Sequence, residues 1–282
     1  MSLLAGLTRR ACGILALGLL ALAGAGTAGA QDARQGIAAD SVVETVKQRG
    51  SLVVGLSTFV PWAMLDRNGQ LIGFEIDVAK QLAEDMGVSV EFVPTAWDGI
   101  IPALIAGRFD VIISGMSITT QRNLTVNFTE PYAYSGVRIA ANRSLEGKIS
   151  ELADFNSPDI TFALRRAATP VAAVQKLFPH ANIVQFDEDG ASLQEVLNGN
   201  ADATAASEPT PSTYVADYPD RLFMPVDDLL GATAEAFAIR KGDPDALNFF
   251  NNWIAAGWRS GFLQERHDYW FRSTDWREQV AQ

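Results

Sequence analysis

Apolar and polar residues alternate along the chain in blocks that predict strands and helices in turn. Residues 51–56, 88–94 and 109–114 are short apolar runs, typical of buried strands. Residues 73–87 and 97–107 instead carry their apolar positions at helical spacing. Because strands and helices follow one another in this order, the pattern predicts an α/β fold with a largely parallel sheet and helices on its faces.

The same alternation begins again further along the chain. Strands are predicted at residues 160–164, 182–186 and 201–206, with helices at 170–178 and 190–198. This second α/β unit has about a hundred residues, an ordinary size for a domain. The chain is therefore expected to form two lobes.

Several shorter signals complete the predicted layout. Residues 41–49 have helical spacing, and Asn68-Gly69 is a strong hairpin turn signal. Extended segments at 137–141 and 234–239 flank the second unit, so we interpret them as the crossovers between two lobes. The tail, residues 245–276, is predicted to be helical and is rich in aromatic residues.

The N-terminus has the features of an export signal. Arg9 and Arg10 precede an apolar run at residues 11–25, and Ala28-Gly29-Ala30 matches a cleavage site. We expect residues 1–30 to be removed, although a retained anchor is the alternative. The paired arginines leave the export route open between Sec and twin-arginine translocation.

Composition narrows the class of protein. The net charge is −11, and it becomes −13 without residues 1–30, which hold two arginines and no acidic residue. This balance argues against nucleic acid and anionic membranes as partners. Cys12 is the only cysteine, so no disulfide, thiol nucleophile or cysteine-based metal site is expected after processing. We find no phosphate loop, catalytic pair or metal-ligand spacing, so no cofactor and no metal are predicted.

Polar groups cluster where the strand at residues 109–114 ends. Ser114, Gly115 and Ser117 offer hydroxyl and backbone N–H groups at the carboxyl end of a parallel strand, where open α/β sheets bind ligands. Arg122 follows with a permanent cation and a planar fork of donors that matches a carboxylate. A solvated surface arginine is the alternative. The segment predicts a receptor for a small carboxylate.

The same segment carries a resemblance to a known family. Ser114 to Arg122 reads Ser-Gly-Met-Ser-Ile-Thr-x-x-Arg and is followed by Val-Asn-Phe-Thr-Glu-Pro-Tyr, which resembles the periplasmic amino-acid-binding proteins that serve ABC importers. The resemblance spans nearly all of the mature chain, with further matches at residues 69–80, 97–104 and 240–244. It implies a two-lobed, type II periplasmic-binding-protein fold with two hinge strands. Lobe one would comprise residues 31–136 and 237–282, and lobe two residues 137–236.

The resemblance also implies which residues hold the ligand. In the family, the counterparts of Ser117 and Arg122 bind the α-carboxylate. Thr169, at the start of a predicted helix in lobe two, would help, because free N–H groups at a helix start favour an anion. The family usually has Gly-Thr-Thr where this chain has Ala167-Ala168-Thr169. The alternative is that Thr169 only caps the helix.

Aromatic residues are candidates for the walls of the cleft. In the family, rings at the positions of Phe59 and Trp62 sandwich the side chain of the ligand, and Trp97 is a third candidate. A flat ring offers a large apolar contact and can face a cation. Ordinary core packing is the alternative for each of them, and for Trp97 the two interpretations are evenly balanced.

Two departures from the family concern the charges in the cleft. Where the family has an aspartate that holds the ligand's ammonium, this chain has Ser207, followed by Glu208. Glu208 is expected to replace the aspartate, or else the ligand lacks an α-amino group. Arg165 and Arg166 stand where neutral residues are usual. One of them could enter the cleft, and Arg166 is taken as the candidate. The ligand would then be a dicarboxylate or an acidic amino acid. The alternative is that both arginines face solvent.

The resemblance implies a monomeric, periplasmic solute-binding protein that delivers an amino acid or related small carboxylate to an ABC permease. It is not expected to be an enzyme. The alternatives are a binding protein for a non-amino (di)carboxylate and a dehydratase similar to cyclohexadienyl dehydratase. By strand count, the general acid of that enzyme would fall at Thr210. A free-standing sensory role is a further alternative.

Overall fold

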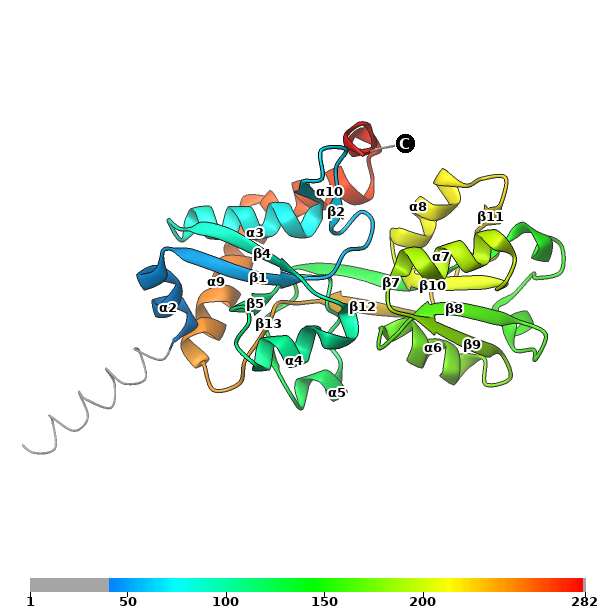
Figure 1. Cartoon of the computed structure of the whole chain (residues 1–282), viewed down its shortest axis with the longest axis horizontal. Coiled ribbons are helices and arrows are strands. Elements are labelled where there is room, and N and C mark those ends of the chain that lie inside the picture. The colour runs from blue at the N-terminus through cyan, green and yellow to red at the C-terminus, as the bar shows by residue number, and fades with distance from the viewer. Residues whose placement is uncertain (1–40, 281–282) are drawn as a thin grey trace, which may run out of the picture.

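The structure is a computed structural model that describes residues 41–280. Two mixed sheets form two lobes that lie side by side (Figure 1). In the first sheet, β1 (Ser51–Leu56) lies between β4 (Ser89–Pro94) and β5 (Val111–Ile112) and pairs with both in parallel. The antiparallel strands β13 (Ala238–Ile239) and β6 (Asn127–Phe128) complete this sheet. The expected signal segment lies outside the described residues.

The second sheet is built from the middle of the chain. Its central parallel part and its antiparallel edge meet at β10, which pairs in parallel with β8 and antiparallel with β7. The strand order along the sheet is β11 (Leu222–Phe223), β7 (Ala133–Asn142), β10 (Ala203–Ser207), β8 (Thr161–Arg165) and β9 (Asn182–Phe186), with β12 (Gly231–Glu235) paired to β7.

Helices cover both sheets, and most of them follow the predicted pattern. In lobe two, α6 lies on one face of the sheet while α7 and α8 lie on the other (Figure 1). The helices are α2 (Val42–Arg49), α3 (Phe74–Asp85), α4 (Ile100–Ile105), α5 (Thr120–Asn123), α6 (Thr169–Leu177), α7 (Asp189–Asn198), α8 (Thr210–Asp217), α9 (Pro244–Ser260) and α10 (Phe262–Phe271), with 3-10 turns η1 (Trp97–Gly99), η2 (Arg143–Leu145), η3 (Leu152–Phe155) and η4 (Asp275–Gln279).

The structure differs from the sequence prediction at one strand and at the helices α5 and α8. The strand expected at 109–114 is regular only at Val111–Ile112, although Asp110 and Ile113 still donate their N–H groups to the Val53 and Gly55 carbonyls at 2.9 and 3.2 Å. Asp110 accepts a hydrogen bond from the Val53 N–H at 2.8 Å, and Ser114 accepts one from the Ser57 N–H at 2.8 Å. Helix α8 was not predicted, although proline early in a helix is a recognised start signal.

Local signals explain where the helices begin and end. Ser41 caps α2 by accepting a hydrogen bond from the Val43 N–H at 3.2 Å, and Gly50 ends it with a left-handed φ of 77°. Asp243 caps α9 in the same way through the Ala246 N–H, at 2.9 Å. These caps satisfy N–H groups that a helix end leaves without partners.

The C-terminal helices return to lobe one. The indole N–H of Trp253 donates to Asp85 at 2.7 Å, and that of Trp270 donates to Asp77 at 2.7 Å, which ties α9 and α10 to α3. Lobe two has its own core, in which the rings of Phe155, Phe162 and Phe178 stack with centroids 5.5 to 5.8 Å apart. Because each lobe has a separate core, the two can move as distinct bodies.

The chain crosses between the lobes twice. Strands β7 and β12 pair antiparallel from Val137↔Gly231 to Ala133↔Glu235 and form a two-stranded ribbon along which both crossings run (Figure 1). The lobes also touch directly, since the Thr210 hydroxyl donates to the Val60 carbonyl at 2.6 Å and Arg277 pairs with Asp217. The cleft between the lobes is therefore closed.

Candidate functional site

The carboxyl end of β5 forms the lobe-one wall of the cleft. Gly115 has a left-handed φ of 55°, and its N–H donates to the Tyr132 hydroxyl at 3.0 Å. A Cβ at Gly115 would lie 2.6 Å from the Phe59 ring, so the residue must be glycine for the ring to approach. This contact holds Phe59 in the lining of the cleft, to which Ser117 also contributes.

Arg122 is held at this wall by the short helix α5. The Thr119 hydroxyl accepts the Arg122 N–H at 3.1 Å and caps the helix. The guanidinium donates to the Ser117 carbonyl at 2.9 Å and, across the cleft, to the Ala167 carbonyl at 3.1 Å. Burial and the nearby charge of Arg165 lower the pKa of Arg122 to about 10. Since both acceptors are neutral, the cation is well placed to take a carboxylate.

The lobe-two wall is the turn between β8 and α6. Ala167 has a positive φ of 58°, which is strained for a residue with a Cβ and explains why glycine suits this position. Its carbonyl accepts hydrogen bonds from both Arg122 and the Trp97 indole, the latter at 3.2 Å. Ala168 is the N-cap of α6, so Thr169 is the first helical residue and not a cap. At this helix start, Pro170 has no N–H and the Val171 N–H donates to the Ala168 carbonyl at 3.2 Å, so the Thr169 N–H is the backbone group that remains for an anion in the cleft.

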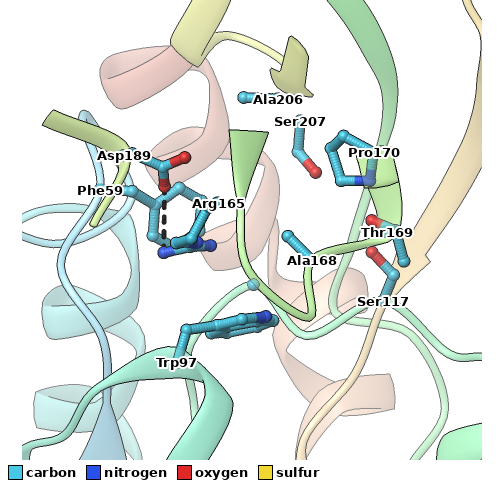
Figure 2. A pocket seen from close by; sticks show the side chains of 11 residues that line it. Phe59, Trp97, Ser117, Arg165, Ala168, Thr169, Pro170, Asp189, Ala206 and Ser207 are labelled. Atoms are coloured by element: carbon cyan, nitrogen blue, oxygen red, sulfur yellow. Dashed lines mark ion pairs between the residues drawn. The ribbon is translucent and has the colours of Figure 1, made fainter. Parts of the chain in front are cut away.

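Arg165 fills the centre of the cleft. Its guanidinium carbon lies 5.0 Å from the centroid of the Phe59 ring and 4.5 Å from that of Trp97. Asp189, the first residue of α7, forms an ion pair with it at 3.0 Å, as Figure 2 shows. Burial raises the pKa of Asp189, and the charge of Arg165 opposes this change. Both side chains are almost fully buried.

Little space remains around these groups. The central cavity has a volume of about 20 Å³, which is room for about one water molecule. Six of the residues predicted from the sequence line it: Phe59, Trp97, Gly115, Ser117, Thr169 and Ser207. Figure 2 labels all of them but Gly115. A larger groove of about 440 Å³ adjoins it and is lined by Arg122, with Trp97 and Thr169 shared between the two.

Four sequence candidates do not line these two cavities. Ser114 is fully buried, and its hydroxyl bonds the backbone of Ser57. Trp62 is also fully buried, in the core of lobe one, where it packs on Phe74 and Phe271.

The other two candidates form ion pairs elsewhere. Glu208 pairs with Arg138 at 3.1 Å and faces a separate groove, so it is not positioned to replace the family's aspartate. Arg166 is exposed and pairs with Asp187, and it is Arg165 that enters the cleft.

Asp189 was missed in the sequence. It follows β9, whose carboxyl end points to the same edge of the sheet as that of β8. An acidic residue at that edge, starting a helix, was a usable signal. Asp189 was overlooked because the acidic residue of the cleft was expected to follow β10.

A buried carboxyl lies next to Ser117. Glu235, on the hinge strand β12, accepts hydrogen bonds from Thr233 at 2.6 Å and Ser135 at 3.0 Å, and its side chain also contacts the Ser117 hydroxyl. Burial raises the pKa of Glu235 to about 7. A protonated Glu235 does not repel an anion, so this environment is compatible with a carboxylate bound at Ser117.

Across residues 41–280, no group of three potential ligands is arranged to hold a metal ion. Over the same residues, no helix has the length and apolar character needed to cross a membrane.

Comparisons with known proteins agree with this geometry. A crystal structure of a putative ABC-transporter binding component from Wolinella succinogenes, complexed with lysine, superposes with a TM-score of 0.77 at 38% identity, covering 82% of this chain and 99% of that one. The L-cystine-binding protein of Escherichia coli is 29% identical over 240 residues, which are 82% of this chain and 86% of the relative. Cyclohexadienyl dehydratase of Pseudomonas aeruginosa is 23% identical over 257 residues, 91% of this chain and 93% of that enzyme.

The two lobes, their paired hinge strands and the closed cleft constitute the type II periplasmic-binding-protein fold. The sequence profile of one family matches residues 52–273, which is most of the chain. The chain therefore belongs to the bacterial extracellular solute-binding proteins, family 3.

Proposed function

We propose that this protein is the periplasmic substrate-binding component of an ABC importer and binds a polar amino acid or related small carboxylate between its lobes. The observation that carries the proposal is Arg122, a half-buried cation whose guanidinium donates to two neutral carbonyl groups and lies 5.3 Å from the centroid of the Trp97 ring. Ser117 lies beside it and the start of α6 faces it from the other lobe. Three kinds of anion-binding group thus converge on one cleft.

Transport is further supported by the relatives named above, one of which is a cystine-binding protein and another a binding component complexed with lysine. Residues 1–30 would direct the chain to the periplasm. The partner would be a membrane permease that recognises the closed lobes. A single chain contains both walls of the cleft, so we propose a monomer.

Whether the ligand carries an α-amino group is the open part of the proposal. Ser207 supplies a hydroxyl where the family has an aspartate, and a hydroxyl does not balance the charge of an ammonium. Glu208 is engaged by Arg138. A carboxylate without an α-amino group is therefore included in the proposed ligand class.

Catalysis of the dehydratase kind is the competing function. Its general acid would stand at Thr210, whose hydroxyl instead donates to the Val60 carbonyl between the lobes. A threonine hydroxyl is too weak an acid to protonate a leaving group at neutral pH. The nearest acidic neighbour, Glu208, is held in an ion pair. Binding without turnover is thus the function that these side chains favour.

A thermal-melt screen tests the proposal. The mature protein would be unfolded and refolded to remove any bound ligand, then melted with amino acids, dicarboxylates, keto acids and prephenate. A ligand at a hundred times its Kd adds about 2.7 kcal/mol of stability, which gives a clear shift. A shift with one class of carboxylate is expected. No shift across the panel would contradict the proposal.

A further inference from the structure

Arg165 occupies an environment that is built for a flat cation. Two aromatic faces enclose its guanidinium, with Phe59 at 5.0 Å and Trp97 at 4.5 Å, and Asp189 balances the charge at 3.0 Å. Stacking between rings and a buried carboxylate partner are the two interactions that best stabilise a guanidinium away from water. We refer to the space enclosed by Phe59, Trp97 and Asp189 as the cation slot.

The cation slot is assembled from both lobes. Phe59 and Trp97 come from lobe one, whereas Arg165 and Asp189 come from the ends of neighbouring elements in lobe two. Both rings are fixed by their own contacts, Phe59 against Gly115 and Trp97 through its hydrogen bond to the Ala167 carbonyl. The positions of both rings in the closed protein therefore rest on contacts other than those with the Arg165 side chain.

A cation from outside would compete with Arg165 for this space. Arg165 is tethered beside the slot, so its effective concentration there is high, in the millimolar range or above for a short linkage. The cavity left around it, about 20 Å³, does not hold a lysine or arginine side chain. A second cation would also meet the repulsion that already acts between Arg165 and Arg122.

We propose that Arg165 is an internal occupant of the cation slot and is the residue that excludes ligands with a cationic side chain. This inference rests on the proposed function and specifies its ligand class, an amino acid or carboxylate that binds Arg122 and carries no distal cation. It follows that removal of the Arg165 side chain converts the cleft into a receptor for guanidinium and ammonium groups.

The test uses the full mature chain with Arg165→Ala and two probes, L-arginine and agmatine. Agmatine has the guanidinium but no carboxylate, so its binding does not depend on Arg122. Titration calorimetry is expected to show at least about tenfold tighter binding of both probes by Arg165→Ala than by the unsubstituted protein, because a desolvated cation–π contact alone contributes on this scale. Arg166→Ala is the matched control, since Arg166 is exposed and pairs with Asp187, and it should leave binding unchanged.

Folding is controlled separately, because Arg165→Ala leaves the buried Asp189 without its partner. The double variant Arg165→Ala/Asp189→Asn removes that charge and should fold, yet it should bind agmatine more weakly than Arg165→Ala. Arg165→Gln, which keeps a polar side chain next to Asp189, is a second variant in which some gain of agmatine binding is expected. Melting curves without and with agmatine report the fold of each variant and its rescue by the cation.

The outcomes are distinct. The inference is overturned if the unsubstituted protein binds L-arginine within threefold of folded Arg165→Ala. If the variants do not fold, tight binding of L-arginine by the unsubstituted protein overturns it, because such binding contradicts exclusion. It is also overturned if folded Arg165→Ala and Arg165→Gln both fail to gain agmatine binding. A gain of agmatine binding by the variant, with no ligand for the unsubstituted protein in the carboxylate screen, would support the slot and count against the proposed function alone.

Discussion

Replacement of Arg122 by alanine should abolish most ligand binding while leaving the fold intact. The Arg122 guanidinium sits between the Ser117 and Ala167 carbonyls, and its pKa is lowered to about 10 by burial and by Arg165. A carboxylate bound here forms a desolvated, charge-assisted pair. Removing one partner of such a pair typically costs about 2–5 kcal/mol, which is about a 30-fold to several-thousand-fold rise in Kd.

The stability of the unliganded protein should change far less. Arg122→Ala removes two hydrogen bonds to neutral carbonyls, each of which contributes about 1.5–3 kcal/mol when the donor is charged. It also relieves the desolvation of the cation and its repulsion by Arg165, which act in the opposite direction. The net change in the free energy of unfolding is therefore expected to stay below about 2 kcal/mol.

The assay is titration calorimetry with the carboxylate that gives the largest shift in the thermal screen. Arg108→Ala is the matched control, because Arg108 is an exposed arginine of the same lobe and its loss changes the net charge equally. Arg122→Lys should bind with intermediate affinity, since it keeps the charge and loses the two-pronged geometry. If Arg122→Ala binds within threefold of the unsubstituted protein, Arg122 does not hold the carboxylate and the reasoning fails.

Three further predictions concern strain, pH and chemistry. Ala167→Gly should raise the free energy of unfolding by about 0.5–1 kcal/mol in denaturant titrations, because the strain of a left-handed alanine outweighs the entropy that glycine loses on folding. Ala168→Gly should lower the free energy of unfolding, because Ala168 has an ordinary φ of −81° and only the entropy loss remains. Burial raises the pKa of Glu75 to about 8, so the folded state holds a proton that the unfolded state has released, and stability should fall by a few kcal/mol as pH rises from about 4.5 to 8. Glu75→Gln should reduce this slope without removing it, because Glu235, with a pKa of about 7, acts in the same direction; an unchanged pH dependence of stability would contradict the role of Glu75. Incubation with prephenate or arogenate should yield no dehydration product by ultraviolet absorbance, and turnover would replace the transport function with an enzymatic one.

Patterning along the chain was enough to predict most of the central strands and helices, and to place the candidate residues at one end of a strand. Alternating blocks of apolar residues located the central strands and their helices to within a few residues, because burial on a sheet face or helix face imposes its period on the chain. The hairpin predicted at Asn68-Gly69 joins the antiparallel strands β2 (Met64–Leu65) and β3 (Leu71–Ile72), and Gly69 has the positive φ, 76°, that such a turn favours. Arg122 and Ser117 were identified from neighbouring positions, since one turn carries both of them to one wall of the cleft.

Tertiary structure decided which side chains meet across the cleft. Trp62 and Trp97 look alike in sequence, yet one is in the core of lobe one and the other bonds Ala167, 70 positions away. Likewise, Arg165 and Arg166 are adjacent, but only Arg165 points to the aromatic rings, because successive side chains of a strand face opposite ways. The local pattern of apolar residues predicts that a side chain is buried, but it does not predict which side chain it meets. Contacts across the cleft depend on how the two lobes close, and closure is set by residues far apart in the chain.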